Sequence, residues 1–528
     1  MGGDPPFLGT MQTSSTDTDV LVAGAGPTGL VLALWLARRG VRVRIIDKSA
    51  EPGTTSRAIA VQARTLELYR QIGLADDVVA RGRRAIAANM WVSGKHVARA
   101  VFGDMGAGIS PYPYALIFSQ DEHERLLIAR LKEIGVAVER PMELLDFEES
   151  SDRIVARLKG PDAAVTPCTA AYVVGCDGAH SAVRETLNIG FAGGTYGHVF
   201  YVADVEGGGA AMNGEVHVAL DSTDFLAVFP LKGDRRARLV GTVREESEHH
   251  HDGLSWDDVS KRVIDWMRID VARVNWFSTY RVHHRVAERF RSGRAFLAGD
   301  AAHIHSPVGG QGMNTGIGDA VNLAWKLAAV VRGLADRAIL DTYETERIAF
   351  ARRLVATTDQ AFTGITSTSA FARALRLHIV PVLIPSLFAF RAVRRLAFRT
   401  VSQTSVNYRG SALSLGAAGP VHGGDRLPWV KTDAGDDRAD NFTPLTSVDW
   451  QVHVYGEAAP EIRAVCEQRR LPLHLFTWRP AMGRSGLQRN AAYLVRPDGY
   501  IGLADRSNGS ATALASYVDA WKLRCDTT

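Results

Sequence analysis

Two glycine-rich loops, far apart in the chain, constrain the fold more than any other feature. The first has the sequence GAGPTG at 24–29 and lies between an apolar run at 18–23 and a stretch of helical periodicity at 28–39. An alternating run at 41–47 follows the helical stretch. A strand, a glycine loop, a helix and a second strand in this order predict the βαβ unit of a dinucleotide-binding fold.

The three glycines of the first loop have separate tasks in such a unit. Gly24 permits the tight turn, Gly26 lets the backbone approach a pyrophosphate, and Gly29 allows the helix to pack closely on the strand. Free N–H groups at the helix N-terminus favour the phosphate further. Asp47 ends the second strand and is placed to accept hydrogen bonds from an adenosine ribose, while Lys48 either reaches the adenosine or stays solvated. The loop therefore predicts a dinucleotide but does not separate NAD from FAD.

The second loop has the sequence GDAAHIHSPVGGQGMN at 299–314 and follows an apolar run at 295–298. Asp300 comes directly after that run, so its carboxylate either accepts hydrogen bonds from ribityl hydroxyls or caps a turn. A helix that starts within the loop can stabilise negative charge on the N1–C2=O edge of a flavin. One ligand that reaches both loops has a pyrophosphate at one end and a polar redox ring at the other, which describes FAD.

Composition excludes several other classes of protein. A chain of 528 residues predicts two to four domains. The net charge of +4 is too small over this length to indicate a nucleic-acid partner. The four cysteines are widely spaced without a CxxC pair, so we expect a cytoplasmic setting, no disulfide framework and no metal site. Residues 1–17 lack the features of a signal peptide and are expected to be a disordered extension.

The most apolar window lies at 379–390. It is interrupted by Pro381 and Pro385 and is shorter than the ~20 residues that span a bilayer, so we expect no integral membrane segment. Four arginines follow it, namely Arg391, Arg394, Arg395 and Arg399. A helix packed on the main body with a solvated basic face is the favoured interpretation, and a role at a membrane surface stays open.

The predicted fold class is α/β, with a Rossmann-type nucleotide-binding domain that is interrupted by a sheet. Alternating runs separated by turns at 191–285 predict an inserted antiparallel sheet, which we expect to bind the substrate. The nucleotide-binding domain is expected at 18–190 and, with a helical region, at 286–400. The stretch at 85–115 either stays in that domain or joins the inserted sheet. A compact α/β domain is expected at 416–528.

Six segments together resemble the FAD-dependent aromatic hydroxylases, the single-component flavoprotein monooxygenases of the p-hydroxybenzoate hydroxylase fold. These segments are GAGPTG at 24–29, SRA at 56–58, CDG at 176–178, the loop at 299–314, DAVNLAWKL at 319–327 and DTYETER at 341–347. The resemblance covers residues 18–400. The part at 416–528 is similar to the thioredoxin-like domain of the phenol and polyketide hydroxylase branch, although it lacks a CxxC motif.

The resemblance places a set of residues against FAD. They are Gly24, Gly26, Thr28, Gly29, Asp47, Lys48, Arg57, Gln120, Asp177, Asp300, Pro307, Gly310, Gly312, Met313 and Asn314. Within this set, Thr28 joins Asp47 and Lys48 at the ADP end of the cofactor. Arg57 is implied to lie near the diphosphate and the path of the moving flavin, and Gln120 near the ribityl or phosphate region.

The remaining implied contacts concern the flavin end. Asp300 would bind the ribityl chain, and Met313 and Asn314 would contact the isoalloxazine through their backbone. Asp177 is implied to serve both FAD and NAD(P)H use, and Arg184 either supports it or is an ordinary surface arginine.

The resemblance also implies a reaction. NADPH or NADH reduces FAD, O₂ adds to the reduced flavin to give a C4a-hydroperoxide, and the ring of a phenolic or polycyclic aromatic substrate attacks the distal oxygen. Two other outcomes stay open, namely Baeyer–Villiger oxygen insertion beside a carbonyl and a flavoprotein that binds an aromatic ligand without turnover. A redox role for Cys466 and Cys525 is disfavoured because no paired motif contains them. A homodimer also stays open.

The sequence gives less information about the catalytic residues than about the cofactor site. Pro307, implied to lie beside the flavin where oxygen reacts, and His305 are weak candidates. His303 and His305 are candidates for a base by their place in the second loop, but a histidine beside a strand end is more often a structural hydrogen-bonding residue. The histidine run at 249–251 is expected to be solvated.

The substrate pocket has three weak candidates. Phe225, Phe229 and Pro230 belong to the inserted sheet, which the resemblance places over the flavin. They either line the pocket or pack in the core of the sheet. The sequence does not decide between the two.

Overall fold

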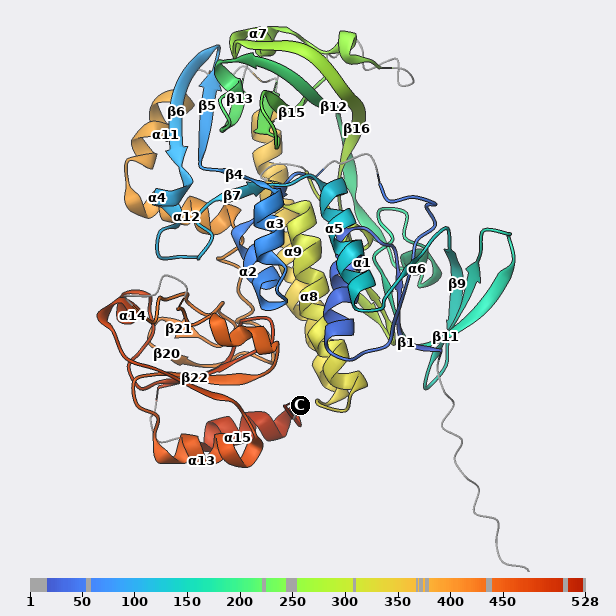
Figure 1. The fold of residues 1–528 in the computed structure, drawn as a ribbon, viewed down its shortest axis with the longest axis vertical. Coiled ribbons are helices and arrows are strands. Elements are labelled where there is room, and N and C mark those ends of the chain that lie inside the picture. The colour runs from blue at the N-terminus through green and yellow to red at the C-terminus, as the bar shows by residue number, and fades with distance from the viewer. Residues whose placement is uncertain are drawn as a thin grey trace, which may run out of the picture.

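The structure is a computed structural model of the whole chain. It describes residues 17–53, 58–220, 225–243, 254–306, 310–366, 369, 374–375, 379–433, 439–506 and 511–525. Arg57, Pro307 and the histidine run at 249–251 lie outside the described residues. Figure 1 shows a central nucleotide-binding part, a curved sheet above it and the C-terminal part below and to one side.

The predicted βαβ unit is confirmed. β1 (Thr18–Ala23) and β2 (Val43–Ile46) pair in parallel, and α1 (Pro27–Arg38) connects them. Pro27 suits the first turn of the helix, where its missing N–H would have no intrahelical partner. Residues 29–36 of α1 are all buried, because the helix lies between the sheet and other helices.

The first sheet has the strand order β17-β18-β11-β1-β2-β8, and β10 and β9 extend it from β11. The further strands are β8 (Val138–Glu139), β9 (Glu143–Glu149), β10 (Ile154–Lys159), β11 (Val165–Gly175), β17 (Arg291–Ser292) and β18 (Ala295–Leu297). β11 pairs in parallel with both β1 and β18. Since parallel strands end at the same edge, the segments that follow β1, β11 and β18 meet there.

Helices pack around this sheet and against one another. They include α2 (Ala63–Gln71), α3 (Ala75–Arg81), α5 (Gln120–Glu133), α6 (Ala182–Thr186), α8 (Gly312–Val331) and α9 (Asp341–Thr366). α1 lies against α5 and α8, and Figure 1 shows α8 running through the centre of the molecule. α8 begins inside the second glycine loop, as the sequence predicted.

The second sheet has the strand order β19-β16-β12-β15-β14-β13-β5-β6. Its strands are β5 (Ala87–Val92), β6 (Lys95–Val101), β12 (Phe191–Gly209), β13 (Val216–Leu220), β14 (Phe225–Pro230), β15 (Arg236–Thr242), β16 (Ile269–Ala287) and β19 (His303–Ile304). The strand pairs are antiparallel except β13 and β5, which are parallel. β19 is part of the second glycine loop, so this sheet is hydrogen-bonded directly to that loop.

A small sheet connects the two large ones. It has the order β3-β7-β4 and consists of β3 (Ala60–Val61), β4 (Arg83–Ala85) and β7 (Ala115–Ile117). Ile59, Ala85 and Ile117 pack against Val216 and Leu231 of the second sheet region. The nucleotide-binding part and the second sheet therefore share an apolar contact.

The C-terminal part contains a six-stranded sheet of order β21-β20-β25-β24-β22-β23. Its elements are β20 (Leu415–Ala418), β21 (Val421–His422), β22 (Gln451–Tyr455), α13 (Pro460–Arg469), β23 (Leu473–Phe476), α14 (Pro480–Arg484), β24 (Ala492–Val495), β25 (Ile501–Asp505) and α15 (Ala511–Ala520). The thioredoxin-like assignment stays a prediction. Cys466 and Cys525 are buried free thiols, and burial raises the pKa of Cys466 to about 11, which disfavours a reactive thiolate.

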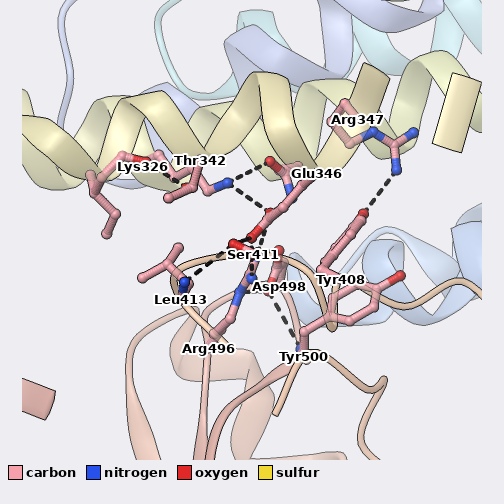
Figure 2. A network of polar contacts seen from close by, with 12 residues as sticks. Lys326, Thr342, Glu346, Arg347, Tyr408, Ser411, Leu413, Arg496, Asp498 and Tyr500 are labelled. Atoms are coloured by element: carbon pink, nitrogen blue, oxygen red, sulfur yellow. Dashed lines mark hydrogen bonds and ion pairs between the residues drawn. The ribbon is translucent and has the colours of Figure 1, made fainter. Parts of the chain in front are cut away.

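A buried ionic cluster joins the C-terminal part to α8 and α9 (Figure 2). Glu346 of α9 accepts hydrogen bonds from Lys326 Nζ and from Arg496 Nη1, both at 2.8 Å. Ser411 Oγ donates to the same carboxylate at 2.7 Å. Arg496 also pairs with Asp498 at 2.8 Å. The side chains of all four charged residues are at most 3% exposed.

Two helices lie beside the edge of the second sheet. α11 (Val380–Phe388) contacts β6, and α12 (Arg391–Val401) contacts α4 (Phe102–Gly106). Among the described residues, no helix is long and apolar enough to cross a bilayer.

A buried histidine in α5 predicts sensitivity to acid. His123 is fully buried, its Nε2 lies 2.8 Å from the Tyr69 hydroxyl, and its Nδ1 has no hydrogen-bond partner among the described residues. Burial lowers the pKa of His123 to about 3. In the unfolded chain this histidine binds a proton below pH ~6.5, whereas in the folded chain it stays neutral until the pH approaches about 3. The free energy of unfolding therefore decreases as the pH falls from ~6.5 towards about 3.

We expect His123→Gln to flatten this dependence, because glutamine keeps a hydrogen bond to Tyr69 and does not titrate. The wild-type free energy of unfolding should fall by up to about 1.4 kcal/mol per pH unit more steeply than that of the variant. Guanidinium unfolding at pH 6.5, 5.5 and 4.5 measures both slopes. Parallel slopes would show that His123 does not contribute.

Candidate active site

The glycines of the first loop differ in what surrounds them. Gly24 has φ +99°, and a Cβ added there would lie 2.3 Å from the carbonyl oxygen of Cys176. A Cβ on Gly29 would lie 2.0 Å from the carbonyl oxygen of Gly24. Nothing lies within 4 Å of a Cβ on Gly26. The first two glycines are therefore required by packing, whereas Gly26 faces open space at the N-terminus of α1, where a pyrophosphate is expected.

Asp47 closes the first loop. Its Oδ2 accepts a hydrogen bond from the backbone N–H of Ala25, and its Oδ1 accepts one from Ser49, both at 2.8 Å. Arg140 Nη1 lies 3.1 Å from Oδ1, and the same guanidinium donates to the carbonyl of Ala25. Lys48 is exposed beside this site. Sequence reasoning missed Arg140, because no motif marks it and only folding brings it to the loop.

Gln120 fixes the backbone at Ala58. Its backbone N–H donates to the Ala58 carbonyl at 3.2 Å, and its side-chain Oε1 accepts from the Ala58 N–H at 3.4 Å. Its Nε2 donates to Glu124 at 2.9 Å. Burial raises the pKa of Glu124. The side chain of Gln120 thus holds the segment that follows Arg57.

The two glycine loops meet at Thr28. A Cβ on Gly299 would lie 2.6 Å from Thr28 Oγ1, and one on Gly316 of α8 would lie 2.3 Å from the same atom. Thr28 at the start of α1 is therefore packed between the second loop and α8. This contact shows that the two loops, 270 positions apart in sequence, lie side by side. The prediction that one long ligand contacts both loops requires this arrangement.

Asp319 holds the second loop from behind. Its Oδ2 accepts from the Gly299 N–H at 3.0 Å and lies 2.6 Å from His303 Nε2, while Arg347 Nε donates to Oδ1 at 2.5 Å. Burial alone would raise the pKa of Asp319, but the Arg347 guanidinium and His303 outweigh it and lower the pKa. His303 is thus held in a structural hydrogen bond. Asp300, by contrast, exposes its side chain.

Asn314 fixes the start of α8. Its side-chain oxygen accepts from the Gln62 N–H at 2.8 Å and from Thr65 Oγ1 at 2.7 Å. Its amide nitrogen donates to the carbonyls of Ala60 and Gly310. Since the side chain of Asn314 is fully engaged, contact with a ligand would involve its backbone, as the family resemblance implied.

The neighbours of Asn314 are arranged as follows. Gly310 has φ +62°, and a Cβ added there would lie 3.1 Å from the Ala60 side chain. Gly312 and Met313, in the first turn of α8, are half-buried. The N-terminus of α8 thus leaves its first backbone N–H groups beside the second loop, where a flavin edge is expected.

His305 presents a buried acceptor near this helix start. Its Nδ1 lies 2.7 Å from the Ser306 carbonyl, so the neutral ring donates through Nδ1 and leaves the Nε2 lone pair free. Among the described residues, neither His305 Nε2 nor Ser306 Oγ has a hydrogen-bond partner. Burial lowers the pKa of His305 to about 4, so the ring is neutral at pH 7.

The CDG segment is tied to the second loop through Arg184. Asp177 accepts a hydrogen bond from the Val183 N–H at 3.3 Å, and burial raises its pKa. Arg184 is buried and donates to the carbonyls of Ala301 and Ala179. Arg184 is therefore not a surface arginine, and its support of Asp177 stays a prediction.

Four half-buried aromatic side chains share one face of the second sheet, namely Phe225, Phe229, Trp276 and Tyr280. They pack around a small aliphatic core on that face. Phe229 also packs with Ile59, next to β3. Since β3 is hydrogen-bonded to Asn314, this face lies next to the start of α8.

Pro230 lies on the opposite face, because side chains alternate along a strand. There it lines a polar cavity of about 280 Å³ with Arg83, Met212 and Glu215. The structure thus brings Phe225 and Phe229 together but not Pro230.

These features fit FAD. Gly26 leaves a cradle that a Cβ would fill, and His305 and Ser306 keep buried polar atoms without described partners. Thr28, at the start of α1, packs against Gly316 near the start of α8. One elongated cofactor can therefore contact both helix N-termini, with phosphate at the first and a ring edge at the second.

The comparisons with known proteins agree with this site. The model of the FAD binding domain family matches residues 17–358, and the chain belongs to this family. It is 35% identical to 6-methylpretetramide 4-monooxygenase of Streptomyces rimosus, with 96% of this chain and 94% of that protein covered.

Two solved structures show the same fold. An anhydrotetracycline hydroxylase from Streptomyces rimosus is 29% identical, with a TM-score of 0.75 and coverage of 96% of this chain and 99% of that one. Aklavinone-11 hydroxylase in a ternary complex with FAD and aklavinone is 26% identical, with a TM-score of 0.75 and coverage of 96% and 98%. The chain is an FAD-dependent aromatic monooxygenase, a class that uses NAD(P)H and O₂, and the predicted class and cofactor are confirmed.

Proposed function

We propose that this monooxygenase hydroxylates a fused polycyclic aromatic substrate that carries a phenol. The aromatic face formed by Phe225, Phe229, Trp276 and Tyr280 carries the proposal. Four aromatic rings on one sheet face, next to the second loop, suit a flat substrate larger than one ring, because offset stacking rewards extended π surfaces. The names of three relatives, which refer to 6-methylpretetramide, anhydrotetracycline and aklavinone, support the same class.

The residues of this chain would contribute binding and orientation. FAD, once bound and reduced by NAD(P)H, supplies the oxygen transfer. Gly26 and the start of α1 would hold its pyrophosphate, Asp300 its ribityl chain, and the backbone of Met313 and Asn314 its ring. The aromatic face would hold the substrate plane and keep water from the reacting carbon.

His305 would orient the substrate. Its Nε2, which has no hydrogen-bond partner among the described residues, can accept a hydrogen bond, and its pKa of about 4 makes it a weak base at pH 7. A substrate hydroxyl that donates to this nitrogen would be fixed beside the second loop. We assign His305 this orienting role, while the place of Pro307 beside the flavin stays a prediction.

The setting of the enzyme is also proposed. The four cysteines are free, which suits the reducing cytoplasm. A homodimer stays a prediction.

A substrate panel tests the proposal. We expect fused tri- and tetracyclic phenols to accelerate NAD(P)H oxidation by at least about tenfold over the rate without substrate, and monocyclic phenols to do less. Oxygen uptake, product mass and NMR would show one added hydroxyl per turnover. Running the panel with NADPH and NADH identifies the reductant.

Three results would contradict it. A ring-opened or lactone product would indicate Baeyer–Villiger insertion. Polycyclic phenols that bind without accelerating NAD(P)H oxidation would indicate an aromatic-binding flavoprotein. Faster turnover of monocyclic phenols would leave the monooxygenase assignment intact and remove the polycyclic substrate class.

A further inference from the structure

A long segment of the chain has no acidic residue. The whole chain carries 57 acidic residues in 528, yet none occurs from 360 to 424, between Asp359 and Asp425. The same segment holds seven arginines. α11 and α12 belong to it, so the arginines of α12 have no acidic neighbour from their own segment.

α11 exposes apolar side chains although it packs on the protein. Ser386 is its one polar residue. On the inner side, Phe388 and Phe398 pack with Met105 of α4. The outer apolar residues, Ile379, Val382, Leu383, Leu387, Phe390 and Leu396, are exposed, with exposed fractions of 69% for Val382, 64% for Phe390 and 65% for Leu396. A helix that is apolar on both sides belongs in a protein core or against a membrane.

Four arginines border this apolar surface. Arg391, Arg395 and Arg399 follow at intervals of four on one side of α12. In the part of the chain that the structure describes, none of these three or Arg394 forms an ion pair with a carboxylate. Arg394 donates to the carbonyl of Phe388 at 2.6 Å, which caps α11. Burial, and then the charges of Arg399 and Arg391, lower the pKa of Arg395.

We propose that α11 and α12 dock the enzyme on the surface of an anionic lipid bilayer. The docking surface consists of Ile379, Val382, Leu383, Leu387, Phe390 and Leu396 with Arg391, Arg394, Arg395 and Arg399. Apolar side chains enter the boundary between headgroups and acyl chains, and arginines bind anionic headgroups. This role is peripheral, and the enzyme does not span the bilayer.

The charge argues against a second copy as the occupant. An isologous dimer would place the docking surface against itself and bring eight arginines together without a carboxylate from this segment. An anionic bilayer neutralises the same charges.

The position of the docking surface connects it to the second sheet. α11 lies against β6, the edge strand at the end of the second sheet opposite β19, and α12 lies against α4 (Figure 1). Docking would hold that edge at the bilayer, where an apolar polycyclic compound concentrates. Bilayer binding itself does not depend on the proposed substrate.

Vesicle sedimentation tests the proposal with the full-length, FAD-loaded protein. We expect binding to vesicles of phosphatidylcholine with phosphatidylglycerol, weak binding to phosphatidylcholine alone, and a loss of binding as salt rises. Arg391→Gln with Arg399→Gln should lower the partition coefficient about 30-fold, from about 1 kcal/mol for each arginine. Val382→Ser with Phe390→Ser should lower it at least about tenfold.

A matched control carries the same types of change at another exposed site. Lys132→Gln with Ile134→Ser alters one basic and one exposed apolar residue at the C-terminal end of α5 and should leave vesicle binding unchanged. FAD content and the unfolding temperature show that each variant is folded.

Several outcomes would overturn the proposal. Equal binding of the wild type to both kinds of vesicle, or none, rejects it without any variant. An equal loss in the control, or no loss in the two docking-surface variants, rejects the assigned residues. A dimer in light scattering that Val382→Ser with Phe390→Ser dissociates would assign the surface to a second copy. If an acidic protein, and not added salt, released the enzyme from vesicles, the docking surface would be assigned to that protein.

Discussion

Arg496→Met is expected to lower the free energy of unfolding by about 3–5 kcal/mol, because it leaves buried carboxylates without their partner. Arg496 is fully buried and bonds to both oxygens of Glu346, at 2.8 and 2.9 Å, and to Asp498. Figure 2 shows Arg496 reaching up from the C-terminal part to Glu346 below the helices. Burial would raise the pKa of Glu346, but Arg496 and Lys326 outweigh it and lower the pKa well below its usual range.

The loss of stability should exceed the coulombic energy of the ion pairs that Arg496 forms. Without Arg496, Glu346 keeps Lys326, Asn322 and Ser411 as donors, while Asp498 keeps Trp325 Nε1 at 3.1 Å. Lys326 then stays paired with Glu346, while the Asp498 carboxylate loses its ion pair with Arg496. Arg496 lies in the C-terminal part, whereas Glu346 lies in α9. Losing this contact should therefore also loosen the C-terminal part from α8 and α9.

Guanidinium unfolding measures the loss, and limited proteolysis of the C-terminal part measures the loosening. Arg409→Met is the matched control, since Arg409 pairs with Asp425 in the same two-bond geometry at 2.7 and 2.8 Å but has a 51% exposed side chain. Arg409→Met should lower the free energy of unfolding by about 1 kcal/mol or less. The double variant Glu346→Gln with Arg496→Met should lose less unfolding free energy than the two single variants lose together. Equal costs for Arg496→Met and Arg409→Met would contradict the buried role.

Local patterns predicted the parts of the site that depend on local structure. The turn at Gly24, the β1–α1–β2 unit and the helix that begins at Gly312 each follow from residues adjacent in sequence. Hydrophobic periodicity and glycine position encode these elements directly. The bounds of β14 also follow from its alternating run.

Contacts between distant segments could not be predicted in this way. Arg140 reaches Asp47 from a loop 93 positions away, and Arg496 reaches Glu346 across 150 positions. Nothing in the sequence near Arg140 or Arg496 marks a partner, because the partner is set by the tertiary fold. Asp319 lies in a segment that carried the family resemblance, yet its three hydrogen-bond donors come from three separate elements.

The substrate face shows the same limit. The 19-residue strand β16 supplies Trp276 and Tyr280, which no motif singled out. Alternation along β14 could have separated Phe225 and Phe229 from Pro230, since positions two and four apart share a face and neighbours do not. Which face meets the second loop depends on how the sheet is placed, and this is a property of the whole fold.

α8 connects the flavin end of the site to the C-terminal part. Its first turn holds Asn314, its middle holds Asp319, and further along it carries Lys326 of the buried cluster. Gln403, at the entry to the C-terminal part, donates to Gln311 Oε1 at 2.7 Å and to Thr315 at 3.0 Å. The C-terminal part therefore supports the same helix whose N-terminus faces the predicted flavin.

Gly26→Val is expected to abolish FAD binding and leave the fold intact. Gly26 has φ −74° and ψ −179°, an extended conformation that valine adopts readily, and nothing lies within 4 Å of its added Cβ. Two methyl groups would fill the space in which the pyrophosphate approaches the backbone. Losing two charge-assisted hydrogen bonds there should cost about 3 kcal/mol or more, which weakens FAD binding at least about 100-fold.

Titration of apoprotein with FAD, followed by flavin fluorescence, measures the affinity, and thermal unfolding without FAD measures the fold. Gly410→Val is the matched control, because nothing lies within 4 Å of its added Cβ either and it is far in sequence from both loops. Gly24→Ala should behave oppositely and lose the fold itself, since its Cβ would lie 2.3 Å from the Cys176 carbonyl oxygen at φ +99°. If Gly26→Val bound FAD as tightly as Gly410→Val, the cofactor would have to cross α1 elsewhere. If Gly26→Val unfolded like Gly24→Ala, the open space at Gly26 would be required by packing and not by the cofactor.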